Sequence, residues 1–344
     1  MILSNSLRKI PVFQVKSPVI WNSLLICLIS LFLLAACSSP PPANSNSNKT
    51  LTVGISPWPG FAGIYTAMDK NFFKAEGVDV KEVNFQAGSD ANTAFLAGRL
   101  DLVWTGVPDM VVMAGKDSSI KLLMLSDYSN GADGILGRNI TKPQDVKGKK
   151  VAMESQFIEF LLLRKYLEKA GLTQKDVTLV EMPAADAASS FAAGKIDVAV
   201  TYEPWMTKVA KQGQGEIIFT SKSTNIIPDG LAAREKLIQE RRADILTYMR
   251  AVDKGVKLAK EKPEQTKGMV AKRLGISPQE VSQQVSGARL FDIETNKSVV
   301  FNPNSPLNVV DSSKFAAKTA KELKFTPNLI DSKTVYDDSP IKSL

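Results

Sequence analysis

Side chains that could hold a small molecule follow several of the predicted strands. Trp58 and Ser56 share a loop with two prolines and a glycine, and such a rigid loop suits an exposed aromatic ring better than a packed strand does. The ring could stack on a planar or cationic ligand, and Ser56 could donate a hydrogen bond to it. Thr105, Glu154 and Glu203 follow three further strands, and Glu203 is the carboxylate that we single out first. The structural alternatives are a core tryptophan, a turn-capping threonine, an exposed glutamate and an internal ion pair.

The residue types that the chain lacks exclude most enzyme classes. Its 344 residues include no histidine, and both cysteines, Cys27 and Cys37, lie within the first 37 positions. Ser-His-Asp and Cys-His catalysis, histidine-ligated zinc and histidine proton transfer are therefore excluded. A disulfide framework, a thiolate nucleophile in the body of the chain and a cysteine-bound metal centre are excluded as well. We predict no catalytic residue, no cofactor and no metal.

The N-terminal segment has the pattern of a secretory signal peptide that ends in a lipid-modified cysteine. Residues 1–18 are polar and basic, an apolar run follows at 19–34, and small residues lead to Cys37. A membrane-spanning helix is the alternative, but the apolar core at 24–36 is short against the ~20 residues that span a bilayer. Leu-Ala-Ala-Cys resembles the lipobox of bacterial lipoproteins, in which the cysteine is acylated and becomes the new N-terminus. Residues 38–49 are rich in serine, proline and asparagine and are predicted to form a disordered tether.

The rest of the chain alternates short apolar strands with longer helical segments, which predicts an α/β fold with mixed or parallel sheets. A turn-rich segment is predicted at 127–134, and the sequence beyond Asp229 is predicted to be mostly helical. An internal repeat supports two similar α/β lobes, because one pattern recurs after 96 positions: Asp90, Phe95, Ala97, Gly98, Asp101, Thr105 and Pro108 match Asp186, Phe191, Ala193, Gly194, Asp197, Thr201 and Pro204. Two such lobes would place corresponding loops on opposite walls of one cleft, where ligands of open α/β sheets bind.

Several motifs follow one another in a characteristic order between residues 50 and 235. They are Val-Gly-Ile-Ser-Pro-Trp-Pro-Gly-Phe at 53–61, Asn-Phe-Phe-Lys-Ala-Glu-Gly-Val-Asp-Val at 71–80, Ala-Gly-x-x-Asp at 97–101, Asp-Val-Lys-Gly-Lys-Lys-Val-Ala at 145–152 and Tyr-Glu-Pro-Trp at 202–205. Together they resemble the nitrate/sulfonate/taurine-type (SsuA/THI5-like) solute-binding lipoproteins of ABC importers. The resemblance implies a type II periplasmic-binding-protein fold, with two α/β lobes, two crossover strands and a helical C-terminal part.

The resemblance also implies a domain division and a set of partners. We expect lobe 1 to comprise 50–137 plus 229–344 and lobe 2 to comprise 138–228, with crossovers near 134–138 and 229–233. The expected partners are a small-molecule ligand, an ABC permease with its ATPase, and a bacterial membrane to which the lipid anchor attaches the protein. The protein is expected to be a monomer outside the cytoplasm, in the periplasm or on the cell surface. Nucleic acid is not expected, because the net charge of +8 falls to about +5 without the leader and is diffuse.

Three residues enter the predicted site through the resemblance: Asp133 at the cleft floor, Tyr202 in the Tyr-Glu-Pro-Trp motif, and Asp229 near the second crossover. Either aspartate could instead simply form a turn. The complete predicted ligand site has four acids and no Lys or Arg, and it comprises Ser56, Trp58, Thr105, Asp133, Glu154, Tyr202, Glu203 and Asp229. Burying several carboxylates beside an anion is costly, so the sequence favours a cationic guanidinium- or amidine-like nitrogen compound.

Two alternatives stay open at this point. Helix N-termini could still bind an anion, so the chain could be a receptor for an aliphatic sulfonate such as taurine, for nitrate or for bicarbonate. An exported hydrolase that works with carboxylates alone is a third hypothesis, from a different class. The thiamine-pyrimidine synthases of the same superfamily consume an active-site histidine, which this sequence lacks. We therefore predict a binding protein that is not an enzyme.

Overall fold

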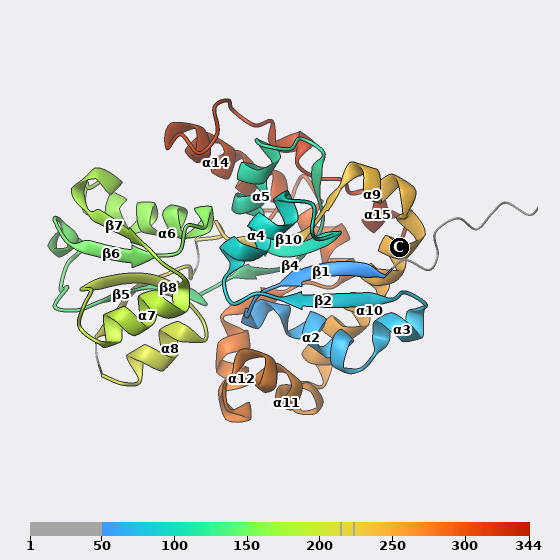
Figure 1. Ribbon diagram of the computed structural model, residues 1–344, viewed down its shortest axis with the longest axis horizontal. Coiled ribbons are helices and arrows are strands. Elements are labelled where there is room, and N and C mark those ends of the chain that lie inside the picture. Colours follow the sequence, from blue (N-terminus) through green and yellow to red (C-terminus); the bar gives the residue numbers. More distant parts are fainter. Residues whose placement is uncertain (1–49, 214, 223) are drawn as a thin grey trace, which may run out of the picture. The chain divides into compact units, whose positions relative to one another are not determined.

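The computed structural model describes residues 50–344 apart from 214 and 223, and it shows two mixed β-sheets flanked by helices (Figure 1). The predicted signal peptide, the lipobox cysteine Cys37 and the tether lie outside the described residues. Within the described part of the chain, no helix is both long and apolar enough to cross a membrane.

The first sheet has six strands in the order β11-β4-β10-β3-β1-β2. Their bounds are β1 Leu51–Ile55, β2 Val80–Asn84, β3 Leu102–Gly106, β4 Ile120–Ser129, β10 Pro228–Arg234 and β11 Ala288–Leu290. β1 is parallel to β2 and β3, whereas β10 runs antiparallel to both β3 and β4. We call this sheet, with the helices packed on it, lobe 1.

Helices cover both faces of the first sheet, and the side chains of β3 show how. Leu102 and Trp104 pack into the cluster with α2 and α10, whereas Val103 packs into the cluster with α4 and α5. Alternate residues of a strand point to opposite faces, so a strand covered on both sides is apolar throughout. The helices of this lobe are η1 Pro59–Phe61, α2 Ala62–Asp69, α3 Phe72–Glu76, α4 Gly88–Leu96, α5 Val107–Ala114 and α10 Arg242–Glu261.

The second sheet has five strands in the order β7-β6-β8-β5-β9. Their bounds are β5 Asp133–Gly137, β6 Lys150–Met153, β7 Thr178–Glu181, β8 Val198–Tyr202 and β9 Glu216–Thr220. β6 is parallel to β7 and β8, and β5 runs antiparallel to β8 and β9. This sheet forms lobe 2 together with η2 Pro143–Val146, α6 Phe157–Glu168, η3 Gln174–Asp176, α7 Ala184–Ala192 and α8 Trp205–Ala210.

The two lobes repeat one strand–helix pattern, as the internal repeat predicts. The order β2-β1-β3 in lobe 1 corresponds to β7-β6-β8 in lobe 2, with parallel pairing in both. The repeated glycines Gly98 and Gly194 end α4 and α7 with φ angles of 73° and 71°. Glycine suits this left-handed position because it has no β-carbon. The α/β fold class with two lobes is confirmed.

The chain changes sheet twice, a few residues before each predicted crossover. It leaves the first sheet after Ser129 and enters the second at Asp133, and it leaves the second after Thr220 and returns at Pro228. The predicted crossover segments 134–138 and 229–233 therefore lie mainly in β5 and β10, which already belong to a sheet. The Oγ atoms of Ser129 and Ser221 lie 2.6 Å apart and join the two connections.

The C-terminal part is mostly helical, and one of its helices contacts both lobes. Its elements are α9 Glu235–Glu240, α11 Pro263–Leu274, α12 Pro278–Ser286, α13 Ile293–Thr295, η4 Asn296–Val300, α14 Val309–Glu322, η5 Ser332–Thr334 and α15 Ser339–Lys342. α14 packs against α5 of lobe 1 and α6 of lobe 2, and Glu322 at its end forms an ion pair with Arg164 of α6 at 2.8 Å. The residue ranges expected for the lobes stay a prediction.

Candidate ligand-binding site

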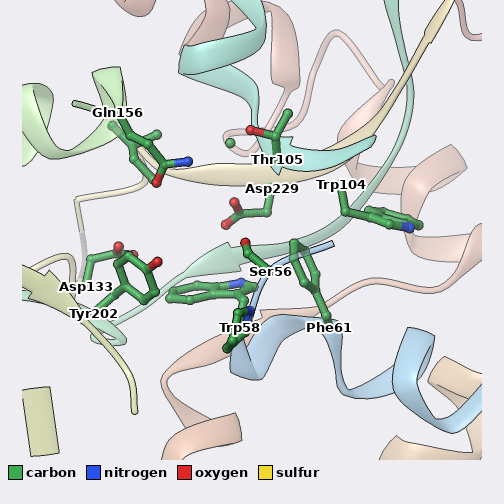
Figure 2. A pocket seen from close by; sticks show the side chains of 12 residues that line it. Ser56, Trp58, Phe61, Trp104, Thr105, Asp133, Gln156, Tyr202 and Asp229 are labelled. Carbon is green, nitrogen blue, oxygen red and sulfur yellow. The ribbon is translucent and has the colours of Figure 1, made fainter. Parts of the chain in front are cut away.

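A small cavity of about 30 Å³ lies between the strand ends of the two sheets (Figure 2). A cavity of this size has room for about two water molecules. Both lobes contribute to its lining, which consists of Ser56, Pro57, Trp58, Phe61, Trp104, Thr105, Gly106, Asp133, Gln156, Ile158, Tyr202 and Asp229. Six of the eight predicted site residues are among these, and Glu154 and Glu203 are not.

The sheet topology brings the lining residues together. Ser56 follows the carboxyl end of β1, and Thr105 and Tyr202 lie at the carboxyl ends of β3 and β8. Asp133 and Asp229 start antiparallel strands, so they lie opposite Tyr202 and Gly106 at the same edges. The carboxyl edge of each sheet therefore carries both parallel-strand ends and antiparallel-strand starts, as expected for ligand sites in open α/β sheets.

Trp58 forms the wall of the cavity that faces lobe 2. Its indole N–H donates to both carboxylate oxygens of Asp127 at 3.2 Å, and its backbone N–H donates to the Tyr65 hydroxyl at 2.9 Å. The side chain is 6% exposed, and its ring meets the ring of Tyr202 edge to face with centroids 6.0 Å apart. Because the indole N–H is already bonded within lobe 1, the ring can offer a ligand its π face but no donor.

Two further aromatic rings, which the sequence reasoning did not single out, complete the lobe 1 wall. Trp104 donates its indole N–H to the Tyr248 hydroxyl at 2.8 Å, and its ring lies 5.9 Å from that of Phe61. A signal for Trp104 exists in the sequence, because it directly precedes the predicted Thr105. Phe61 follows the Trp58 loop and gives no comparable signal.

Asp133 and Asp229 give the cavity its negative character. Both are buried, and the Oδ2 atom of each lacks a hydrogen-bond partner within the described residues, as does the Thr105 hydroxyl. Burial and the nearby charge of Glu203 raise the pKa of Asp133 to about 7. Burial, with repulsion from Asp127 and Asp133, raises the pKa of Asp229 well above its ordinary value. In Figure 2 the Asp229 carboxylate points into the ring of labelled side chains.

The charge and donor pattern of the cavity suits a ligand that donates hydrogen bonds. Buried polar atoms are normally paired, so two carboxyl oxygens and one hydroxyl without partners around one cavity favour a guest that donates several hydrogen bonds, and the hydroxyl can accept one of them. The lining includes no Lys or Arg among the described residues. Nor does the described part of the chain hold a group of three or more His, Cys, Asp or Glu residues suited to a metal ion.

The two predicted glutamates that do not line the cavity bind helix N-termini instead. Glu203 accepts hydrogen bonds from the backbone N–H of Thr207 at 3.1 Å and from the Thr207 hydroxyl, and so caps α8. Glu154 accepts from the backbone N–H of Ser89 at 2.7 Å, and more weakly from Ala184 N–H and the Tyr202 hydroxyl, both at 3.4 Å. Glu203, which we singled out first, therefore makes its contacts within lobe 2.

Three buried acids near the cavity were missed by the sequence reasoning. Asp109 accepts hydrogen bonds from the backbone N–H groups of Phe157 at 2.7 Å and Ile158 at 3.2 Å, and Glu159 accepts from Glu154 N–H at 2.6 Å. Asp127, the partner of Trp58, lies on β4 and not in the predicted turn at 127–134. Asp109 directly follows a proline, and a proline followed by an acid is typical of the first turn of a helix. The sequence gives no sign, however, that Asp109 binds the start of a helix in the other lobe.

Comparison with known proteins gives one family and several named relatives. The family described as NMT1/THI5 like matches residues 58–266. A putative aliphatic sulfonates-binding protein of Bacillus subtilis (strain 168) is 26% identical over 251 residues, which cover 70% of this chain and 74% of the relative. A putative ABC transporter periplasmic binding protein of Brachyspira hyodysenteriae is 23% identical and covers 66% and 70%. The formylaminopyrimidine-binding protein of Halalkalibacterium halodurans is 21% identical and covers 69% and 74%.

Solved structures share the fold at low sequence identity. The alkanesulfonate-binding protein SsuA from Xanthomonas axonopodis pv. citri, bound to MOPS, has a TM-score of 0.73 at 17% identity, covering 84% of this chain and 98% of SsuA. The periplasmic nitrate-binding protein NrtA from Synechocystis PCC 6803 has a TM-score of 0.65 at 16% identity, covering 86% and 85%. The desulfurization enzyme DSZB has a TM-score of 0.61 at 16% identity, covering 86% and 98%. The chain shares the fold of SsuA and NrtA, and it belongs to the NMT1/THI5-like family.

Proposed function

We propose that this protein is the extracytoplasmic solute-binding component of an ABC importer, and that it captures a small cationic nitrogen compound of the guanidinium or amidine type. The family and the names of its relatives support the first part, because they are binding proteins and one is named for an ABC transporter. The single observation that carries the second part is the pair of buried, unpaired carboxylate oxygens of Asp133 and Asp229 in an aromatic cavity.

A guanidinium ion matches the charge and the hydrogen-bonding groups of this cavity. Its planar fork of N–H groups can donate to a carboxylate on lobe 1, a carboxylate on lobe 2 and the Thr105 hydroxyl at once. Its charge offsets the repulsion between buried carboxylates, and its flat face can lie on Trp58. Because Asp133 has a pKa of about 7, a cationic ligand would displace a bound proton, and affinity should rise with pH through neutrality.

The names of the relatives leave the ligand class open, so the chemistry of the cavity decides between cation and anion. One relative is named for aliphatic sulfonates and another for formylaminopyrimidine, and one structural neighbour is named for nitrate. An anion placed beside Asp133 and Asp229 would lose its hydration without gaining a cationic partner, because the described lining has no Lys or Arg. The small cavity further favours a ligand of few atoms.

Binding without chemical conversion is part of the proposal, although an enzyme shares the fold. Neither histidine nor cysteine occurs among residues 50–344, so a histidine-activated serine and a cysteine nucleophile are excluded. Ligand contacts to Trp58 and Asp229 on one wall and to Asp133 and Tyr202 on the other would favour closure of the lobes. The closed monomer would then dock on the permease, while the lipid on Cys37 holds the chain at a bacterial membrane.

Titration of the full-length chain in detergent with guanidinium, taurine and nitrate tests the proposal. We expect millimolar or lower guanidinium to give saturable heat in calorimetry and to raise the melting temperature, whereas taurine and nitrate do neither. Asp229→Asn should weaken guanidinium binding about tenfold or more, because a charge-assisted hydrogen bond is lost. Asp176→Asn is the matched control, because Asp176 caps η3 on the surface of lobe 2, and it should bind as the wild type does. Saturable binding of taurine or nitrate, without binding of guanidinium, would establish the anion receptor instead.

A further inference from the structure

Helix N-termini at the cleft are occupied by carboxylates of the chain itself. Glu154 accepts from Ser89 N–H at the start of α4, and Asp109 accepts from Phe157 and Ile158 N–H at the start of α6. α4 and α6 have nine and twelve residues, so each presents a full helix dipole at this end. Without these carboxylates, the same N–H groups would form ready anion sites.

The two contacts cross between the lobes in opposite directions. Glu154 follows β6 of lobe 2 and reaches α4 of lobe 1, whereas Asp109 lies on α5 of lobe 1 and reaches α6 of lobe 2. Gln156 packs in the same gap, since a β-carbon on Gly88 would lie 2.1 Å from its Nε2 atom. The N-termini are therefore covered from the opposite wall when the lobes meet, so a bound anion would have to displace a carboxylate from each.

We propose that Asp109 and Glu154 are specificity-determining residues, whose carboxylates occupy the N-termini of α6 and α4 and thereby exclude anionic ligands from the cleft. The inference rests on the proposed function, because it explains how a family whose relatives are named for sulfonate and nitrate could include a cation receptor. Both side chains are buried and face backbone donors, so neither needs a basic partner. The carboxylates of Asp109 and Glu154 neutralise the positive ends of α6 and α4. The negative potential of Asp133 and Asp229 therefore stays available to attract a cationic ligand.

Two kinds of variant separate occupancy of the N–H groups from charge. Asp109→Ala and Glu154→Ala remove the carboxylate and free the helix N–H groups, whereas Asp109→Asn and Glu154→Gln remove the charge but keep an acceptor oxygen in place. The probes are sulfate and guanidinium, titrated separately into the full-length chain by calorimetry and by thermal shift. Asp176→Ala is the matched control, because it also frees a backbone N–H from a carboxylate, but away from the cleft.

We expect the wild type and Asp176→Ala to show no saturable sulfate binding. The alanine variants should gain saturable sulfate binding, at least about tenfold tighter than the weakest affinity that the titration detects, because a freed helix N-terminus and lost repulsion both favour the anion. The amide variants, which lose only the charge, should bind sulfate about threefold more weakly than the alanine variants. Each amide variant keeps one acceptor oxygen for the helix N–H groups and disturbs the fold less than alanine does, so it tests the inference even where an alanine variant does not fold.

The outcomes distinguish this inference from the proposed ligand class. If the wild type binds guanidinium but no variant gains sulfate, the specificity role is wrong and the ligand class stands. If the variants gain sulfate but the wild type does not bind guanidinium, the role stands and the ligand class is wrong. Tight sulfate binding by the wild type would overturn both.

Discussion

Trp58 owes its position in the candidate site to two neighbours, Asp127 and Gly60. Ser126 Oγ donates to Asp127 Oδ2 at 2.8 Å, which holds the carboxylate under the indole N–H. A β-carbon on Gly60 would come 2.1 Å from Asp127 Oδ2 and 2.3 Å from Trp58 Nε1. Gly60 is therefore needed for close approach, since any side chain would push the carboxylate and the indole apart.

Gly60→Ala is expected to displace the indole and to lower the affinity for guanidinium about tenfold, because the stacking surface is lost. Isothermal titration calorimetry measures this directly. Gly268→Ala is the control, since Gly268 is exposed in α11 and a β-carbon there meets nothing within 4 Å. That variant should keep its affinity and gain up to about 1 kcal/mol of helix stability. Equal affinity in both variants would contradict a role for the fixed indole.

The sequence predicts which residues follow strand ends better than it predicts where their side chains point. Ser56, Thr105 and Tyr202 line the cavity because a strand end fixes the position of its own residues. Glu203 is at such an end too, but Thr207, one helical turn further on, takes its carboxylate as a cap. Competition between a ligand and a local backbone donor depends on angles that residue spacing does not encode.

At the scale of elements, helix starts are the parts that join the two sheets. The first turn of α6 has its N–H groups satisfied by Asp109 of α5, in place of a capping residue of its own. Burial raises the pKa of Asp109 to about 7, although the hydrogen bonds from Phe157 and Ile158 N–H act in the opposite direction and lower it. The stability of this helix start therefore depends on a side chain from the other lobe.

Removing that carboxylate should loosen the start of α6 selectively. Asp109→Ala leaves two buried N–H groups unpaired, which costs about 1–3 kcal/mol for each, and hydrogen exchange at Phe157 and Ile158 should accelerate roughly tenfold or more. Asp186→Ala is the comparison, because Asp186 is an exposed acid in the first turn of α7, and its loss should cost no more than about 0.5 kcal/mol. Unchanged exchange in Asp109→Ala would mean that the contact contributes nothing to the helix start.

Among the elements, the repeated strand–helix units could be predicted and the cross-lobe contacts could not. Apolar runs with glycine stops define β1, β3, β6 and β8 locally, and the glycine positions recur in both lobes. β4 extends to Ser129 through a segment that looks like a turn, because β10 and β11 pair with it on either side. The contacts of α14 with both lobes are likewise tertiary and leave no periodic signal.

At the scale of the whole molecule, buried acids make stability depend on pH in an unusual direction. Burial raises the pKa values of Asp109, Asp127 and Asp133 to about 7 each. Between pH ~4 and ~7 the folded chain therefore holds protons that the unfolded chain has released, and stability falls as pH rises. The partly buried acids Glu280 and Asp292 have pKa values lowered to about 2 by hydrogen bonds and nearby lysines, so their stabilising contribution is lost only as pH falls below ~4.

We expect the free energy of unfolding of the ligand-free chain to decrease from pH 5 to pH 7, by a change on the order of several kcal/mol. Urea denaturation followed by circular dichroism measures it, and guanidinium chloride is unsuitable because it is the proposed ligand. Asp133→Asn should reduce the slope, whereas Asp176→Asn, at the partly exposed cap of η3, should keep it. A stability that rises over this pH range would show that the buried acids are ionised in the fold.

The glycine contact between α2 and α10 has a consequence for how ligand preference can diverge in evolution. A β-carbon on Gly255 would lie 2.1 Å from the Gly63 carbonyl oxygen, so the two helices touch backbone to backbone. α2 begins directly after the Trp58 loop, which leaves that wall little freedom to retreat from a bulkier guest. Descendants that adapt to larger solutes should therefore carry their substitutions on the opposite wall, around Asp133 and Tyr202, while the tryptophan wall is inherited unchanged.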